Sequence, residues 1–208
     1  FDEPVRAWEP DGQGVAVMTD RSRYEASRLV LAAGPWLNTL LPRSPMPLRV
    51  ERQVMYWFEP EHPSDRFNPD QCPVHLWEYE RSRFFYGFPN LGHGVKVAFH
   101  HRGEETTPDS VRREVAENET DTMRSVLRRF LPGAAGRLLK TAVCLYTKTP
   151  DEHFLIDTLP EHPRVLALSP CSGHGFKFSS VVGEIAALLA CDETPPFDLS
   201  LFRRRSPC

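Results

Sequence analysis

Hydrophobic and polar residues follow different patterns in successive regions of the 208-residue chain. Residues 14–19 alternate with the period of two that is typical of a strand. Residues 28–33 form a short apolar run, which predicts a strand buried on both faces. The run ends at Gly34-Pro35-Trp36, where the backbone has to turn, and residues 36–41 fit one helical turn. The first region therefore has α/β character.

The middle of the chain has the pattern of an antiparallel meander. Residues 49–58 are rich in β-branched and aromatic side chains and predict a long strand. Asp109 is placed to cap a short helix through Val115, and a second helix follows it. The other predicted elements are strands at 74–79, 83–88, 94–100 and 142–146, and a helix with apolar positions Met123, Val126, Leu127, Phe130 and Leu131.

The last region returns to α/β character. Strands are predicted at 154–157 and 165–169, and residues 172–175 precede an amphipathic helix. The order of α/β, β-rich and α/β regions predicts a mixed α+β and α/β fold in which one domain is split in sequence by another. The predicted segments are residues 1–45, 46–146 and 147–208.

Composition and charge narrow the class of protein. The chain has 40% hydrophobic and 25% charged residues and a formal net charge of -3 without a basic stripe, which argues against nucleic-acid and membrane partners. No apolar run reaches transmembrane length, and the residues after Phe1 lack the basic and apolar stretches of a signal peptide, so we expect none. An odd number of cysteines without a CxxC pair argues against a disulfide framework or a zinc site. We therefore expect a reducing, cytoplasmic location and no bound metal.

The segment 172–180, SGHGFKFSS, carries the strongest chemical signal. Gly173 and Gly175 allow backbone N–H groups to approach a ligand, the helix N-terminus adds partial positive charge, and Lys177 adds a full one. These features predict a site for an anion or for the electron-rich edge of a ring. A glycine-rich loop capped by Ser172 beside a solvated lysine explains the same residues equally well.

Two predicted strands carry further candidates. Cys144 has two functional interpretations, as a nucleophile or as a point of covalent cofactor attachment. The alternative is a small buried apolar residue, and general chemistry favours this alternative. Tyr146 is most simply a core aromatic with its hydroxyl at the surface. Lys96 and His100 are four residues apart on a strand, so they share one face. That face lines a polar pocket or meets solvent, and the residues alone favour solvent.

Together these segments resemble the monomeric sarcosine oxidase and N-methyltryptophan oxidase family, which also includes pipecolate oxidase. The resemblance rests on CLYTKTPDEHFLID at 144–157 and SGHGFKFSS at 172–180, and it extends over roughly residues 14–203. It implies part of an FAD-binding domain of the glutathione-reductase-like type, interrupted by a β-rich substrate domain with an antiparallel sheet and helices.

The same resemblance implies an activity and roles for individual residues. A secondary amino acid such as sarcosine is oxidised to an imine, which hydrolyses, and O2 is reduced to H2O2. Cys144 carries the FAD through a thioether, Lys177 pairs with the substrate carboxylate, and Tyr146 and His100 line the substrate cavity. Lys96 corresponds to the lysine near the flavin N5 position. The loop residues that face the flavin pyrimidine edge are Gly173, His174, Gly175 and Phe176.

The chain also departs from the family pattern. It has no G-x-G-x-x-G motif and no counterpart of the family's carboxylate-binding arginine, and Pro170 changes the residues before the loop. The N-terminal FAD-binding segment is therefore an expected partner, and the isolated chain is expected to be poorly soluble and inactive. The alternative functions are a non-catalytic remnant or partner-binding module, and a flavin dehydrogenase that does not use O2.

Overall fold

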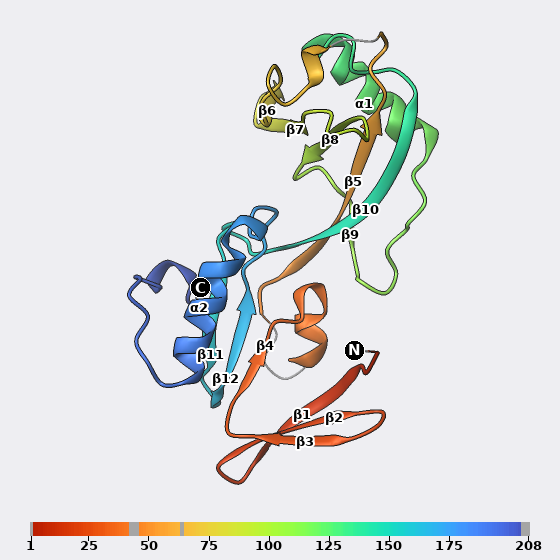
Figure 1. The fold of residues 1–208 in the computed structure, drawn as a ribbon. Coiled ribbons are helices and arrows are strands. Elements are labelled where there is room, and N and C mark those ends of the chain that lie inside the picture. Colours follow the sequence, from red (N-terminus) through yellow and green to blue (C-terminus); the bar gives the residue numbers. More distant parts are fainter. Residues whose placement is uncertain (1, 42–45, 63–64, 205–208) are drawn as a thin grey trace. The chain divides into compact units, whose positions relative to one another are not determined.

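The computed structural model describes residues 2–41, 46–62 and 65–204, and the chain divides into two compact units. Unit 1 comprises Phe1–Arg49 and Thr147–Cys208, and unit 2 comprises Val50–Tyr146. Unit 1 is therefore assembled from both ends of the chain, and unit 2 is inserted between them in sequence (Figure 1).

Unit 1 begins with a three-stranded antiparallel sheet in the order β1-β2-β3. Its strands are β1 (Val5–Asp11), β2 (Gly14–Thr19) and β3 (Arg23–Ala26). The strand that the alternation at 14–19 predicts is confirmed by β2, which buries Val15 and Ala16.

A second sheet of unit 1 lies between two apolar clusters. Its strands are β11 (Leu155–Leu159), β12 (His162–Ser169) and β4 (Leu29–Leu31), in the order β11-β12-β4. Alternate residues of β12 belong to different clusters. Val165 and Ala167 pack with Leu37 of η1 (Gly34–Leu40), whereas Leu166 and Leu168 pack with Val182 and Ile185 of α2 (Ser179–Ala190). The short helix η4 (Ser200–Phe202) follows α2.

Strand β4 differs from its prediction. It lies at the edge of its sheet, where it pairs in parallel with β12, and its Val30 is 38% exposed. Val30 is opposite Leu166 on the neighbouring strand β12. Helix α2 covers Leu166 but does not fully cover the edge strand β4. Burial on both faces is therefore wrong for β4 in the described part of the chain.

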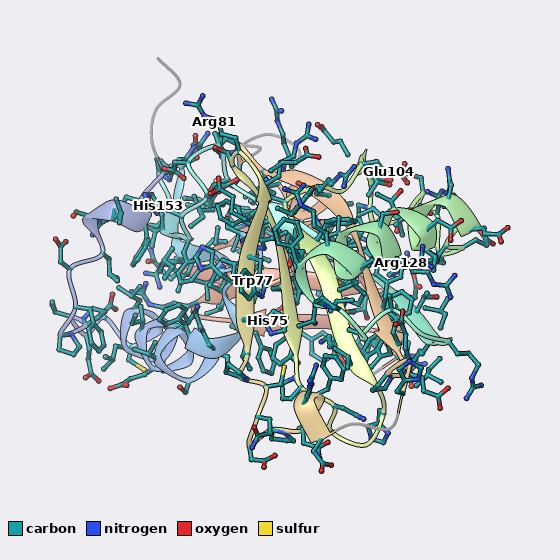
Figure 2. All side chains as sticks on the ribbon, turned by 90° about the horizontal axis from the view of Figure 1, so that it is seen from above. His75, Trp77, Arg81, Glu104, Arg128 and His153 are labelled. Carbon is teal, nitrogen blue, oxygen red and sulfur yellow. The ribbon has the colours of Figure 1, made fainter. Side chains whose placement is uncertain are left out.

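Unit 2 is built on a six-stranded sheet in the order β10-β5-β8-β7-β6, with β9 paired to β5. Strands β5, β8, β7 and β6 pair antiparallel, which confirms the predicted meander. His75 and Trp77 of the edge strand β6 are labelled in Figure 2. The strands are β5 (Arg49–Phe58), β6 (His75–Glu80), β7 (Arg83–Phe88), β8 (Val95–His100), β9 (Glu105–Thr106) and β10 (Leu138–Lys148), and the short helix η2 (Asp65–Phe67) follows β5.

One face of this sheet packs against α1 (Glu117–Phe130). The fully buried Met123 and Leu127 of α1 belong to the same apolar cluster as Phe58, Phe85 and Val97 of the sheet. These helical residues are among the apolar positions that predicted the helix. Because strand side chains alternate, the residues between the buried ones project from the opposite face.

The short helix predicted at Asp109–Val115 is wrong. Residues 108–110 form a turn, and residues 111–116 are irregular. The buried Arg52 guanidinium donates hydrogen bonds of 2.7 Å to the carbonyl oxygens of Arg112 and Glu114. These tertiary contacts hold residues 111–116 in the irregular path that the structure shows.

Candidate functional site

The face of the unit 2 sheet opposite α1 carries a group of aromatic and ionisable side chains, which we call the open face. The group includes three of the four residues that the sequence selected in catalytic roles, together with Cys144. The members of the open face are Trp57, Tyr86, Phe88, Lys96, His100, Cys144 and Tyr146.

Lys96 lies in a row of three residues across the sheet. It is opposite Phe88 on β7 and Trp57 on β5. Its Nζ is 5.0 Å from the ring centroid of Phe88 and 5.4 Å from that of Trp57. Aromatic faces attract ammonium groups at such distances, so Lys96 is held by cation–π contacts rather than directed freely into solvent.

Tyr146 belongs to a second group of side chains on the open face. The side chains of Tyr146 and Tyr86 interact, and burial raises the pKa of both phenols. The His100 ring centroid is 6.0 Å from that of Tyr146 and 6.2 Å from that of Tyr86. Both phenols therefore stay protonated and can offer hydroxyl groups to a polar ligand.

Sequence reasoning missed Tyr86. The signal that could have found it is the alternation on β7, which places Phe85 in the core and Tyr86 on the opposite face.

The Cys144 thiol is partly buried in a cationic environment. Burial raises its pKa, and the charges of Lys96 and Arg113 act in the opposite direction. Arg113 is tied to the same strand, because its guanidinium donates a hydrogen bond of 3.0 Å to the carbonyl oxygen of Val143. Thiolate is the reactive form of cysteine, so these cations favour the reactive state against the effect of burial.

The other predicted residues lie in unit 1, in the loop between β12 and α2. Ser172 is fully buried, and its φ of 44° is in the left-handed region. Its hydroxyl donates a hydrogen bond of 2.8 Å to the carbonyl oxygen of His153, and its N–H donates one of 2.8 Å to that of Thr147. Ser172 therefore fixes the loop to the end of β10 and to the segment that follows it.

The rest of this loop turns its side chains outward. Phe176 is 95% exposed, and Lys177 is exposed with its Nζ 5.5 Å from the ring centroid of Phe178. The His174 ring packs against the Phe154 ring, with a distance of 4.9 Å between the two ring centroids. Residues 176–178 form a short 3-10 helix, η3, that leads into α2 at Ser179. The loop thus presents a cation and an apolar ring beside a helix N-terminus.

Gly175 lies where no larger residue fits without a backbone shift. A Cβ at this position would be 1.6 Å from the carbonyl oxygen of Pro170. Glycine is thus required for close packing of the loop on itself, and Pro170 is part of that packing.

A separate polar cavity of about 230 Å³ lies within unit 2. Its charged lining includes Arg52 and Glu119, which form an ion pair of 2.7 Å. Burial would raise the pKa of Glu119, but hydrogen bonds from Arg112, Arg52 and the Ala116 N–H outweigh it and lower the pKa to about 2. These groups satisfy one another, so we assign them to structure rather than to chemistry.

Within residues 2–41, 46–62 and 65–204, no group of His, Cys, Asp and Glu side chains is suited to a metal ion. The helices of the same residues include none that is long and apolar enough to cross a membrane.

Comparison with known proteins identifies relatives over nearly the whole chain. Residues 1–189 match the model of the family described as FAD dependent oxidoreductase. The chain is 42% identical to monomeric sarcosine oxidase of Streptomyces avermitilis over 99% of its own length and 54% of that protein. It is 38% identical to N-methyl-L-tryptophan oxidase of Salmonella arizonae, over 98% of this chain and 54% of that one.

A solved structure shows the same fold. The crystal structure of glycine oxidase from Geobacillus kaustophilus matches with a TM-score of 0.78 at 16% identity, over 99% of this chain and 52% of that chain. The chain therefore spans about half the length of the proteins that it matches.

Proposed function

Because the chain belongs to the FAD dependent oxidoreductase family, we propose that it forms part of an oxidase of N-methyl amino acids. Its relatives are named monomeric sarcosine oxidase and N-methyl-L-tryptophan oxidase. The proposed substrate is a secondary amino acid, and the products are an imine, which hydrolyses to an aldehyde and an amine, and H2O2. FAD accepts the hydride equivalent from the substrate, and the protein supplies placement and charge.

The observation that carries this proposal is the convergence of four predicted residues on one face of one sheet. Lys96, His100, Cys144 and Tyr146 come from β8 and β10, and the structure places all four on the open face. Aromatic rings with cations and protonated phenols suit a flat, electron-accepting ring and an amino-acid substrate. This chemistry fits FAD without a metal ion.

Within this proposal, each residue has a role that its surroundings support. Cys144 attaches the flavin covalently, and the nearby cations assist by favouring its thiolate. Tyr146 and His100 line the substrate cavity, together with Tyr86. Lys96 places a positive charge where O2 is reduced.

The loop of unit 1 has two proposed roles. Lys177 pairs with the substrate carboxylate, for which its exposed ammonium is available. Gly173, His174, Gly175 and Phe176 face the flavin, where the helix N-terminus favours negative charge on the reduced ring. Unit 1 is accordingly proposed as part of the FAD-binding domain and unit 2 as the substrate domain.

Covalent attachment is tested by acid precipitation of the FAD-loaded protein. The wild-type precipitate should stay yellow, whereas Cys144→Ala should release free FAD. Cys171→Ala is the matched control, because Cys171 is also partly buried but lies in the loop of unit 1. Retention of flavin by the Cys144→Ala precipitate would reject the attachment at Cys144.

The role of Lys177 is tested with substrates that differ in one group. Lys177→Met should raise KM about tenfold or more for an N-methyl amino acid, because a charge-assisted contact contributes about 1.5–3 kcal/mol. KM for an N-methyl amine without a carboxylate should change little. Equal losses on both substrates would exclude the pairing. Comparison of O2 with an artificial electron acceptor then separates an oxidase from a dehydrogenase.

A further inference from the structure

The Lys96 ammonium is held by aromatic rings, with no recorded carboxylate partner among the described residues. The sheet register fixes this arrangement, because Phe88, Lys96 and Trp57 are directly opposite one another on three adjacent strands. A carboxylate partner would cancel the charge of Lys96. An aromatic face attracts the ammonium and leaves its net charge in place.

Trp57 also contacts a second cation. The Nζ of Lys140, on β10, is 5.3 Å from the same ring centroid. The indole thus contacts ammonium groups from β8 and β10, and no ion pair with a carboxylate is recorded for Lys140 in the described chain either. Two uncompensated positive charges at one ring raise the positive potential of this part of the open face.

We propose that Trp57 is a positioning residue that holds the Lys96 ammonium where the reduction of O2 creates negative charge, with Lys140 adding to the potential. This inference rests on the proposed function. Reoxidation transfers two electrons and two protons from the reduced flavin to O2 and yields H2O2. The first electron converts O2 to superoxide, an anion, and a fixed ammonium stabilises that charge as it forms.

The test is stopped-flow kinetics of the FAD-loaded protein, with flavin reduction and reoxidation followed separately. Trp57→Leu removes the ring face and should slow reoxidation by O2 about three- to tenfold, in line with the strength of one cation–π contact. Flavin reduction by the amine should stay within about twofold, since that step creates no superoxide. Trp57→Phe keeps a ring face and should restore most of the rate.

Trp77→Leu is the matched control, because Trp77 lies on the same sheet, on the edge strand β6 (Figure 2). It should reoxidise at the wild-type rate. In a Lys96→Met background, Trp57→Leu should cause no further slowing, because the group that it positions is gone. Trp57→Leu should also shift the flavin midpoint potential in the same direction as Lys96→Met.

Three results would overturn the positioning role: equal slowing by Trp57→Leu in both backgrounds, failure of Trp57→Phe to restore the rate, or wild-type reoxidation by Lys96→Met. Failure of the proposed function is distinguishable, since the flavin would then not be reduced by any N-methyl amino acid. In that case the midpoint potentials, measured with a chemical reductant, still decide whether Trp57 acts through Lys96.

Discussion

The open face of unit 2 and the loop of unit 1 hold their candidate residues in different ways. On the open face, strand register places the side chains, as it does for Lys96 between Phe88 and Trp57. In the loop, backbone packing at Gly175 and the buried hydroxyl of Ser172 fix the position. A substitution on the open face should therefore change chemistry more than stability, and a substitution in the loop should cost stability first.

Gly175→Ala should have the largest effect on stability. The added Cβ would lie 1.6 Å from the Pro170 carbonyl oxygen, so the backbone must shift. We expect a loss of about 3 kcal/mol, measured by urea unfolding. Gly183→Ala is the control, because it lies in α2 with no atom within 4 Å of the new Cβ, and it should stabilise slightly. A Gly175→Ala variant as stable as wild type would refute tight packing of the loop.

Ser172→Ala should have the next largest effect. It removes the hydroxyl that donates to the His153 carbonyl oxygen and leaves that partly buried group with one partner fewer, at a cost of about 1–3 kcal/mol. Ser172→Gly should lose less, since glycine adopts the φ of 44° without strain. Thermal unfolding compares the two with Ser180→Ala, an exposed position of α2. Equal losses for Ala and Gly would show that backbone strain at Ser172 is unimportant.

Glu119 provides a pH test of unit 2 away from the open face. Its pKa of about 2 in the folded chain is below the ordinary 4.5, so the Glu119 carboxylate binds a proton more strongly in the unfolded state than in the folded state. The stability that Glu119 contributes is present above pH 4.5 and is lost as the pH falls towards 2.

Glu119→Gln should therefore cost about 1–2 kcal/mol at pH 7 and little at pH 2.5. Unfolding by urea at both pH values measures this difference. Glu117→Gln, on the exposed first turn of α1, is the control and should show no such dependence. A cost that is the same at both pH values would contradict the role of the ionised Glu119 carboxylate.

Tyr86→Phe should have the smallest effect on stability and a clear effect on chemistry. It removes the hydroxyl that interacts with Tyr146 and should cost about 1 kcal/mol or less in urea unfolding. Under the proposed function, KM for the amino acid should rise several-fold because the cavity loses a polar group. Tyr24→Phe, on β3 of unit 1, is a control without a role on the open face. A larger loss of stability for Tyr86→Phe than for Ser172→Ala would contradict the expectation that substitutions in the loop cost more stability than substitutions on the open face.

The sequence anticipated much of the site but not its arrangement. The period of two places Lys96 and His100 on one face, and the structure extends that face to Cys144 and Tyr146 on β10. That the Trp57 and Phe88 rings on adjacent strands flank Lys96 is a feature that no local pattern reveals. The helix at Asp109–Val115 failed because Arg52, distant in sequence, holds this segment in an irregular path through the carbonyl oxygens of Arg112 and Glu114.

By itself, the sequence determined five of the six strands of the unit 2 sheet, the helices α1 and α2, and the chemical character of the SGHGFKFSS loop. Periodicity and glycine placement act over a few residues, so the chain carries these signals locally. Only the tertiary structure decided that Trp57 and Tyr86 join the open face and that Ser172 anchors the loop. Cross-strand register and buried hydrogen bonds join residues that are far apart in sequence, and their energies exist only once the chain has folded.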